Sequence, residues 1–168
     1  MLALNRTWVE LQMRFIRAIS LLFFCLAVGA AAAGAPAAAG APAAPELSSL
    51  HGKVVYLDFW ASWCAPCRQS FPWMNELQKR YADRGLTVIA VNVDHERADA
   101  EKFLRKRPPA FQIRFDPDGD LARRFDVHGM PTSVVLDRSG KARYTHIGFR
   151  NADAAQYEQQ IQQLLAEH

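Results

Sequence analysis

The sequence predicts an α/β domain with a central mixed β-sheet and helices on both faces. Continuous apolar runs at Val54–Trp60 and Leu86–Val93 are each followed by a helical pattern, which indicates parallel strands joined by a helix. Two further strand-like segments, Thr132–Leu136 and Ala142–Ile147, flank the turn-forming residues Asp137–Gly140 and predict a hairpin. A hairpin is antiparallel, so one sheet that holds all of these strands must be mixed.

Helical patterns follow both apolar strands. The segment Pro66–Arg84 has a proline in its first turn and stops before Gly85, a residue typical of helix C-termini. One face of this helix continues from Cys67 through Phe71, Met74, Leu77 and Tyr81, and we expect that face to be buried. A second helix is predicted at Arg97–Arg107, where Pro108 ends it.

Shorter elements complete the predicted domain. Ala110–Phe115 is expected to form a short strand, Asp116–Gly119 a turn and Leu121–Phe125 a short helix. The last helix is predicted at Asp153–Glu167. Its apolar face carries Tyr157, Ile161, Leu164 and Leu165.

The first 45 residues differ from the rest in composition. Arg14 and Arg17 introduce the apolar stretch Ile16–Ala33, which ends in small residues, and this order is typical of a secretory signal peptide. We therefore predict a signal peptide over residues 1–33, with cleavage after Ala33 or after Ala39. A membrane anchor over the same residues is the alternative, because the stretch is long enough to span a bilayer.

Residues 34–45 consist of alanine, proline and glycine, which predicts an extended linker, and residues 46–168 are predicted to be the folded domain. Met13 is a second candidate start, because it stands immediately before the basic residues of the leader.

Composition excludes several classes of protein. Hydrophobic residues make up 50% of the chain, which excludes a disordered protein. The formal net charge is +3, but Arg6, Arg14, Arg17 and Glu10 fall in the predicted leader, so the remainder carries +1. The basic run Lys102–Arg107 lies in a predicted helix behind acidic residues, as on a solvated helix face. No nucleic-acid partner is therefore predicted.

The chemistry of the chain is expected at Cys64-Ala65-Pro66-Cys67, where a predicted strand gives way to a predicted helix. A helix N-terminus favours a thiolate over a thiol, which makes Cys64 the candidate nucleophile. Cys67 lies one helical turn further on the buried face, so it is the candidate resolving thiol. A structural disulfide and half of a metal site are the alternatives; the first would stabilise little because its loop is short.

A metal centre is not expected. The third cysteine, Cys25, falls in the predicted leader, so the domain lacks the second cysteine pair of a zinc site. His51, His95, His128 and His146 show no paired ligand spacing, and we expect them at the surface or in loops.

Several separated motifs resemble those of one family. Asp58–Cys67 (DFWASWCAPC) closely resembles the active-site segment of thioredoxins, and Gly129–Thr132 (GMPT) is similar to their cis-proline segment. Further phrases resemble the TlpA/ResA subgroup of exported bacterial thiol:disulfide oxidoreductases, namely Ser70–Pro72, Val91–Asp94, Phe115–Gly119 and Leu136–Gly140. The resemblance covers about residues 49–168 and implies a thioredoxin-like fold.

The resemblance also implies roles for individual residues. Pro131 would be a cis-proline facing the cysteine pair, and the backbone of Met130 would pair with an extended substrate. Trp63, Ala65 and Pro66 would complete the substrate-binding surface. Asp58 would be a buried acid with a raised pKa that deprotonates Cys67. An ordinary turn proline and a solvated strand-end acid are the alternatives for Pro131 and Asp58.

The implied function is reduction of disulfides in exported client proteins, in the bacterial periplasm, by a monomer that needs no bound cofactor. A membrane thiol reductant of the DsbD type would recharge the cysteine pair, and cytochrome c maturation is one implied setting. Contact with the membrane is expected only if the N-terminal segment is retained. A non-catalytic thioredoxin-fold module that binds clients and a thiol peroxidase are the alternatives.

Overall fold

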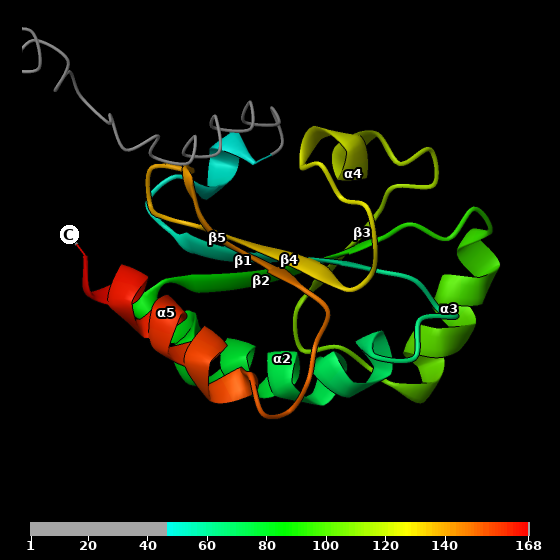
Figure 1. Cartoon of the computed structure of the whole chain (residues 1–168), viewed down its shortest axis with the longest axis horizontal. Helices are drawn as coiled ribbons and strands as arrows, with labels where there is room; N and C mark the ends of the chain where they lie inside the picture. Colours follow the sequence, from blue (N-terminus) through cyan, green and yellow to red (C-terminus); the bar gives the residue numbers. More distant parts are fainter. Residues whose placement is uncertain (1–46, 168) are drawn as a thin grey trace, which may run out of the picture. The chain divides into compact units, whose positions relative to one another are not determined.

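A computed structural model of the chain describes residues 47–167, and the predicted leader and linker lie outside these described residues. Figure 1 shows a sheet with helices on both of its faces. The strands are β1 (Val54–Trp60), β2 (Leu86–Asn92), β3 (Gln112–Phe115), β4 (Thr132–Leu136) and β5 (Ala142–Ile147). The α-helices are α2 (Cys67–Tyr81), α3 (Arg97–Lys106), α4 (Asp120–Arg124) and α5 (Ala154–Ala166), and the short 3-10 helices are η1 (Ser48–Leu50) and η2 (Ala82–Arg84).

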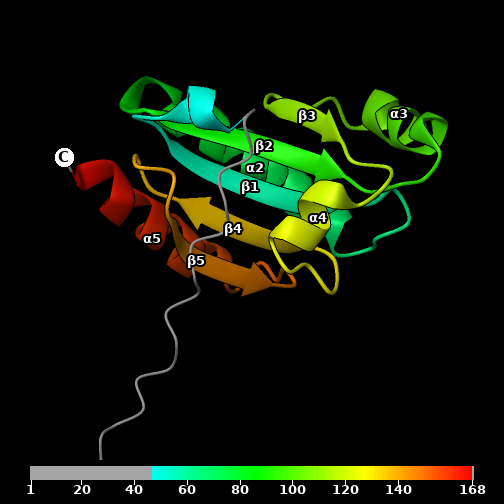
Figure 2. The same ribbon diagram turned by 90° about the horizontal axis from the view of Figure 1, so that it is seen from above.

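The strands of the described region pair in the order β3-β2-β1-β4-β5. Strand β1 is central: it lies parallel to β2 on one side and antiparallel to β4 on the other. Strand β3 adds in parallel to β2, and β5 adds in antiparallel to β4. Figure 2 looks onto this sheet from the α4 side and shows the same order. The predicted mixed sheet is confirmed.

The two faces of the sheet belong to two hydrophobic clusters. Val54, Tyr56 and Trp60 of β1 point toward α2, α3 and α5. Val55 and Leu57 point to the other face, toward α4 and Leu47. All seven residues of β1 are buried, which explains why its sequence is apolar on both faces, apart from Asp58, rather than alternating.

The long helix predicted at Pro66–Arg84 ends earlier than its pattern indicates. Helix α2 stops at Tyr81, and a 3-10 turn, η2, carries the chain to Gly85. Gly85 has φ +94°, a left-handed backbone conformation that glycine adopts without steric cost. The predicted apolar face of this helix is confirmed, because Cys67, Phe71, Met74, Leu77 and Tyr81 are all buried.

An aromatic cluster fixes α2 on the sheet. The ring of Phe71 lies 4.8 Å from that of Trp60, 5.0 Å from that of Phe103 and 5.4 Å from that of Phe111, measured between ring centroids. Edge contacts of this kind stabilise beyond the area that the rings bury. The cluster thus joins β1, α2 and α3 one turn beyond the cysteine pair, and so positions the N-terminus of α2.

None of the helices between residues 47 and 167 has the length and the apolar character that crossing a membrane requires.

Candidate active site

The two cysteines lie at the end of the loop that joins β1 to α2. They form a disulfide, with their Cα atoms 5.3 Å apart. Cys67 is the first residue of α2 and is fully buried, whereas Cys64 retains slight exposure. The backbone N–H of Cys67 donates to Sγ of Cys64 at 3.2 Å. In the reduced protein, this N–H and the positive end of the helix dipole would stabilise a thiolate on Cys64.

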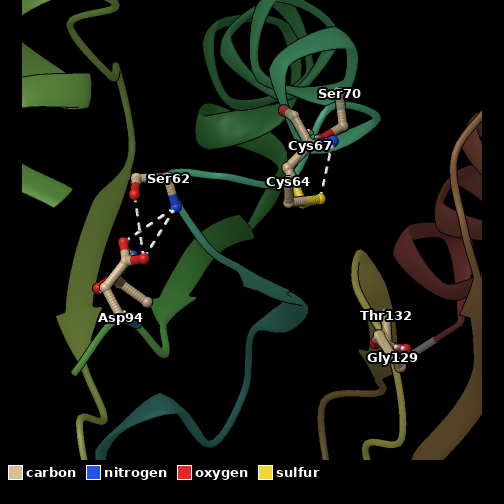
Figure 3. Close-up of a disulfide and its surroundings, with 8 residues drawn as sticks. Ser62, Cys64, Cys67, Ser70, Asp94, Gly129 and Thr132 are labelled. Carbon is tan, nitrogen blue, oxygen red and sulfur yellow. Dashed lines mark hydrogen bonds between the residues drawn. A yellow bond between two sulfur atoms is a disulfide. The ribbon is translucent and has the colours of Figure 1, made fainter. Parts of the chain in front are cut away.

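Asp94 anchors the loop that precedes the cysteines. Its buried carboxylate accepts the backbone N–H of Ser62 at 2.9 Å and the Ser62 hydroxyl at 3.0 Å (Figure 3). The side-chain amide of Asn92 donates to the same carboxylate at 2.8 Å. Asn92 ends β2 and Ser62 follows β1, so Asp94 joins the ends of two neighbouring parallel strands directly beside the cysteine turn.

Asp94→Ala is expected to lower the free energy of unfolding by about 1–3 kcal/mol, because it leaves a buried donor of Asn92 and partly buried donors of Ser62 without their acceptor. Denaturant unfolding measures this change, with Asp83→Ala at an exposed position as the matched control, expected within about 0.5 kcal/mol of the parent. Equal stabilities of the two variants would show that Asp94 does not hold the loop.

Asp58 is buried within β1, with 1% of its surface exposed. Residues two positions apart in a strand share a face, so Asp58 lies on the same face as Tyr56 and Trp60. That is the face on which α2 and Cys67 pack. The Oδ2 atom of Asp58 has no hydrogen-bond partner among the described residues. Burial raises the pKa of this carboxyl well above its ordinary value. The structure therefore does not support the alternative of a solvated strand-end acid.

The Met130–Pro131 peptide bond is cis, as the resemblance implies. The carbonyl of Pro131 accepts the N–H of Gly148 at 2.7 Å, and the Thr132 hydroxyl donates to the carbonyl of Gly129 at 2.7 Å. Among the described residues, the backbone of Met130 forms no hydrogen bond, which leaves it available for a partner strand.

The predicted substrate-binding residues differ in exposure. Trp63 is 68% exposed and Ala65 is also exposed, whereas Pro66 and Met130 are half-buried and Pro131 is buried. Pro66 lines a surface pocket of about 520 Å³ together with Gly148, which is bonded to Pro131. The structure thus brings the cysteine turn and the cis-proline segment to one site.

The sequence interpretation missed two residues at this site. Ile147, at the end of β5, is 82% exposed beside the pocket. His146 was expected at the surface or in a loop, and that expectation is wrong: it is a buried residue of β5 with 8% exposure. The physical reason is that α5 covers the inward face of β5, so that the His146 ring stacks on Tyr157 at 3.7 Å between centroids.

Within residues 47–167, no group of three or more histidine, cysteine, aspartate or glutamate side chains is placed to hold a metal ion. The chemistry that this site can perform with its own residues is thiol–disulfide exchange.

Comparisons with known proteins agree with this geometry. The sequence pattern of the Redoxin family matches residues 27–161. The thiol-disulfide oxidoreductase ResA of Bacillus thuringiensis subsp. konkukian is 34% identical over 96 residues, which cover 57% of this chain and 56% of ResA. The match thus spans little more than half the length of that curated relative.

Two solved structures from Chlorobium tepidum are similar. One is assigned as the thiol:disulfide interchange protein DsbE; it is 54% identical with a TM-score of 0.70, over 71% of this chain and 85% of that one. The other is a thiol:disulfide interchange protein of the thioredoxin family, 28% identical with a TM-score of 0.64, over 71% and 85% of the two chains. These similarities confirm the predicted thioredoxin-like fold.

Proposed function

Because the chain belongs to the Redoxin family, we propose that it is a thiol-disulfide oxidoreductase that reduces disulfides in exported client proteins. The observation that carries this proposal is the cysteine pair at the start of α2, with the Cys67 N–H directed at Cys64 Sγ. This arrangement gives the more accessible sulfur the stabilised negative charge, as a nucleophile requires.

In the first step, the Cys64 thiolate attacks one sulfur of a client disulfide. A new bond forms between Cys64 and the client, the client disulfide breaks, and the departing client thiolate takes up a proton. In the second step, Cys67 gives its proton to the Asp58 carboxylate and attacks Cys64. The Cys64–Cys67 disulfide forms, the mixed disulfide breaks, and the second client sulfur leaves as a thiolate, which takes up a proton from solvent. The client gains two electrons, which the cysteine pair supplies.

Client binding is proposed on the surface around the disulfide. The free backbone groups of Met130 suit pairing with an extended client segment, as a strand adds to a sheet edge. The exposed side chains of Trp63 and Ile147 provide apolar contact nearby. Ala65 and Pro66 form the turn between the two sulfurs, so a client disulfide must approach over them.

The setting is also a proposal. The predicted leader would export the domain to the periplasm, where a membrane thiol reductant of the DsbD type would return electrons to the oxidised pair. The ResA relatives and the DsbE neighbour support a thiol-disulfide oxidoreductase, and the predicted leader supports its export. We propose a monomer whose clients include proteins of cytochrome c maturation.

The direction of exchange is tested by equilibrating the full chain with glutathione buffers and measuring the reduced fraction. The Ala65-Pro66 dipeptide resembles the Gly-Pro of reducing thioredoxins, so we expect a reduction potential below about −200 mV. A value near that of strong oxidants, about −120 mV, would contradict the reductase proposal. Faster turnover of hydrogen peroxide than of insulin disulfides would instead favour a thiol peroxidase.

A further inference from the structure

A buried chain of hydrogen bonds runs from His146 toward the interior of the sheet. The Ser133 hydroxyl lies 3.1 Å from Nδ1 of His146, and the Tyr56 hydroxyl donates to Ser133 Oγ at 2.8 Å. On the other side of the ring, Nε2 lies 2.7 Å from Oε1 of Gln160 on α5. Four side chains from β1, β4, β5 and α5 are thus linked in one network.

The partners of His146 fix the direction of these bonds. An amide oxygen can only accept, so Nε2 must carry the hydrogen that Gln160 receives. In the neutral imidazole Nδ1 then accepts, and the Ser133 hydroxyl must donate to it. Burial lowers the pKa of His146, which favours this neutral form near pH 7, while the Gln160 bond opposes the shift.

The same network borders the buried acid of the site. Ser133 stands directly opposite Asp58 in the β1–β4 pairing and directly opposite His146 in the β4–β5 pairing. Directly opposed residues share one face of the sheet, with Cβ atoms about 4.5–5.5 Å apart. Asp58, Ser133 and His146 therefore form a row across three strands, but Oδ2 of Asp58 has no hydrogen-bond partner among the described residues, Ser133 included.

The outer end of this row reaches the surface. His146 lines the pocket of about 520 Å³ that also contains Pro66 of the cysteine turn. Asp58 itself has almost no exposed surface, yet each catalytic cycle of the proposed function requires its carboxyl to gain one proton and lose it again. The row is a path by which that proton can leave.

Resting on the proposed function, we propose that His146 and Ser133 relay protons between Asp58 and the pocket. Once Asp58 has taken the proton of Cys67, its side chain turns so that its O–H donates to Ser133 Oγ, a bond that the oxidised structure does not contain. Ser133 then passes its own hydrogen to Nδ1 of His146. The bond from Nε2 to Gln160 Oε1 must then open, so that the imidazolium can release its Nε2 proton to water in the pocket. One proton leaves Asp58 and one enters solvent, and no electron moves.

The charged and titratable groups that face His146 come from three parts of the fold. From α5 and its N-cap these are the stacked ring of Tyr157 and the nearby Asp153, whose charge raises the pKa of His146. Arg150 of the β5–α5 loop lines the same pocket and pairs with Asp153 at 2.7 Å, which offsets that charge. From β1 they are Tyr56 and Asp58, reached through Ser133 of β4.

The relay is tested by a readout that does not depend on activity. In the oxidised full chain with ¹³C-labelled aspartate, the Asp58 carboxyl carbon is followed by NMR across the pH range. A relay couples the two groups, so the Asp58 resonance should titrate in two steps, the second coinciding with the titration of His146. In His146→Gln and in Ser133→Ala, the Asp58 resonance should titrate in a single step. Tyr56→Phe, which removes a bond of the network but not the bridge, should keep both steps.

A second measurement follows the release of client from a mixed disulfide on Cys64 at fixed pH. His146→Ala should slow this step by about tenfold or more, and added imidazole should restore most of the rate. 1-Methylimidazole has no N–H in its neutral form and should not restore the rate, which separates a relay from simple filling of the cavity. A single-step Asp58 titration in the parent, or equal rescue by both compounds, would overturn the relay. If the NMR coupling is present but no client is reduced, the proposed function fails and the relay stands.

Discussion

Cys64→Ser is expected to lower the rate of insulin disulfide reduction by roughly a thousandfold or more, to the uncatalysed background. A serine hydroxyl stays protonated near pH 7 and cannot form the mixed disulfide, even though the N–H of Cys67 still points at it. The rate of insulin precipitation in the presence of a dithiol measures this loss.

Two further cysteine variants separate the possible causes of that loss. Cys67→Ser should still attack clients but should stall, so that a client-linked species accumulates on non-reducing gels and can be identified. Cys25→Ser, in the predicted leader, should reduce insulin at the parent rate and is the matched control. Unchanged client handling by Cys64→Ser would favour the non-catalytic binding module over the enzyme.

Asp58→Leu is expected to have two opposed effects. It should slow the attack by Cys67 on the mixed disulfide by about a hundredfold, because the resolving thiol loses its base. It should also raise the free energy of unfolding at pH 8 by about 1–3 kcal/mol, because a buried carboxylate with an unpartnered oxygen is replaced by an apolar side chain of similar size. Single-turnover kinetics and denaturant unfolding measure the two effects.

The pH dependence of that stability gain follows from the raised pKa of Asp58. Above the pKa of the unfolded chain, the folded protein holds a proton that the unfolded chain has lost, so the parent loses stability as the pH rises toward the folded value. The advantage of Asp58→Leu should therefore be smallest near pH 4 and largest above the folded pKa. Asp118→Ala, at an exposed position, should show no such trend. A gain that does not depend on pH would mean that Asp58 is not the titrating group.

The sequence predicts the central strands well because buried strands are composed mainly of apolar residues. Strand β1 packs on both faces, so its continuous apolar run could be read directly, and Thr132–Leu136 and Ala142–Ile147 are confirmed as β4 and β5. The end of α2 coincides with the end of its apolar face at Tyr81, whereas the prediction extended the helix to Arg84 because Gly85 is typical of helix C-termini. Between Tyr81 and the left-handed turn at Gly85 the backbone tightens into the 3-10 turn η2.

The parts of the site that lie close together in the sequence were predictable. The parts whose burial or conformation depends on tertiary packing were less predictable. The position of Cys64 and Cys67 follows from the strand–helix junction, and the cis bond before Pro131 followed only from resemblance. Alternation along β5 places Tyr144 and His146 on one face and Ile147 on the other, so the exposure of Ile147 could have been found. The burial of His146 could not, because it depends on how α5 crosses that face.

The central position of β1 also governs when the domain can form. Tyr56 of β1 bonds to Ser133 of β4, which lies 77 positions later in the chain. Contacts between such distant segments form late, because a long loop must close before they contribute stability. While the C-terminal hairpin and α5 are still missing, β1 lacks one of its two neighbours and its apolar side chains stay uncovered. The order of the strands therefore predicts that a growing chain cannot complete its sheet until almost all of the domain has been synthesised.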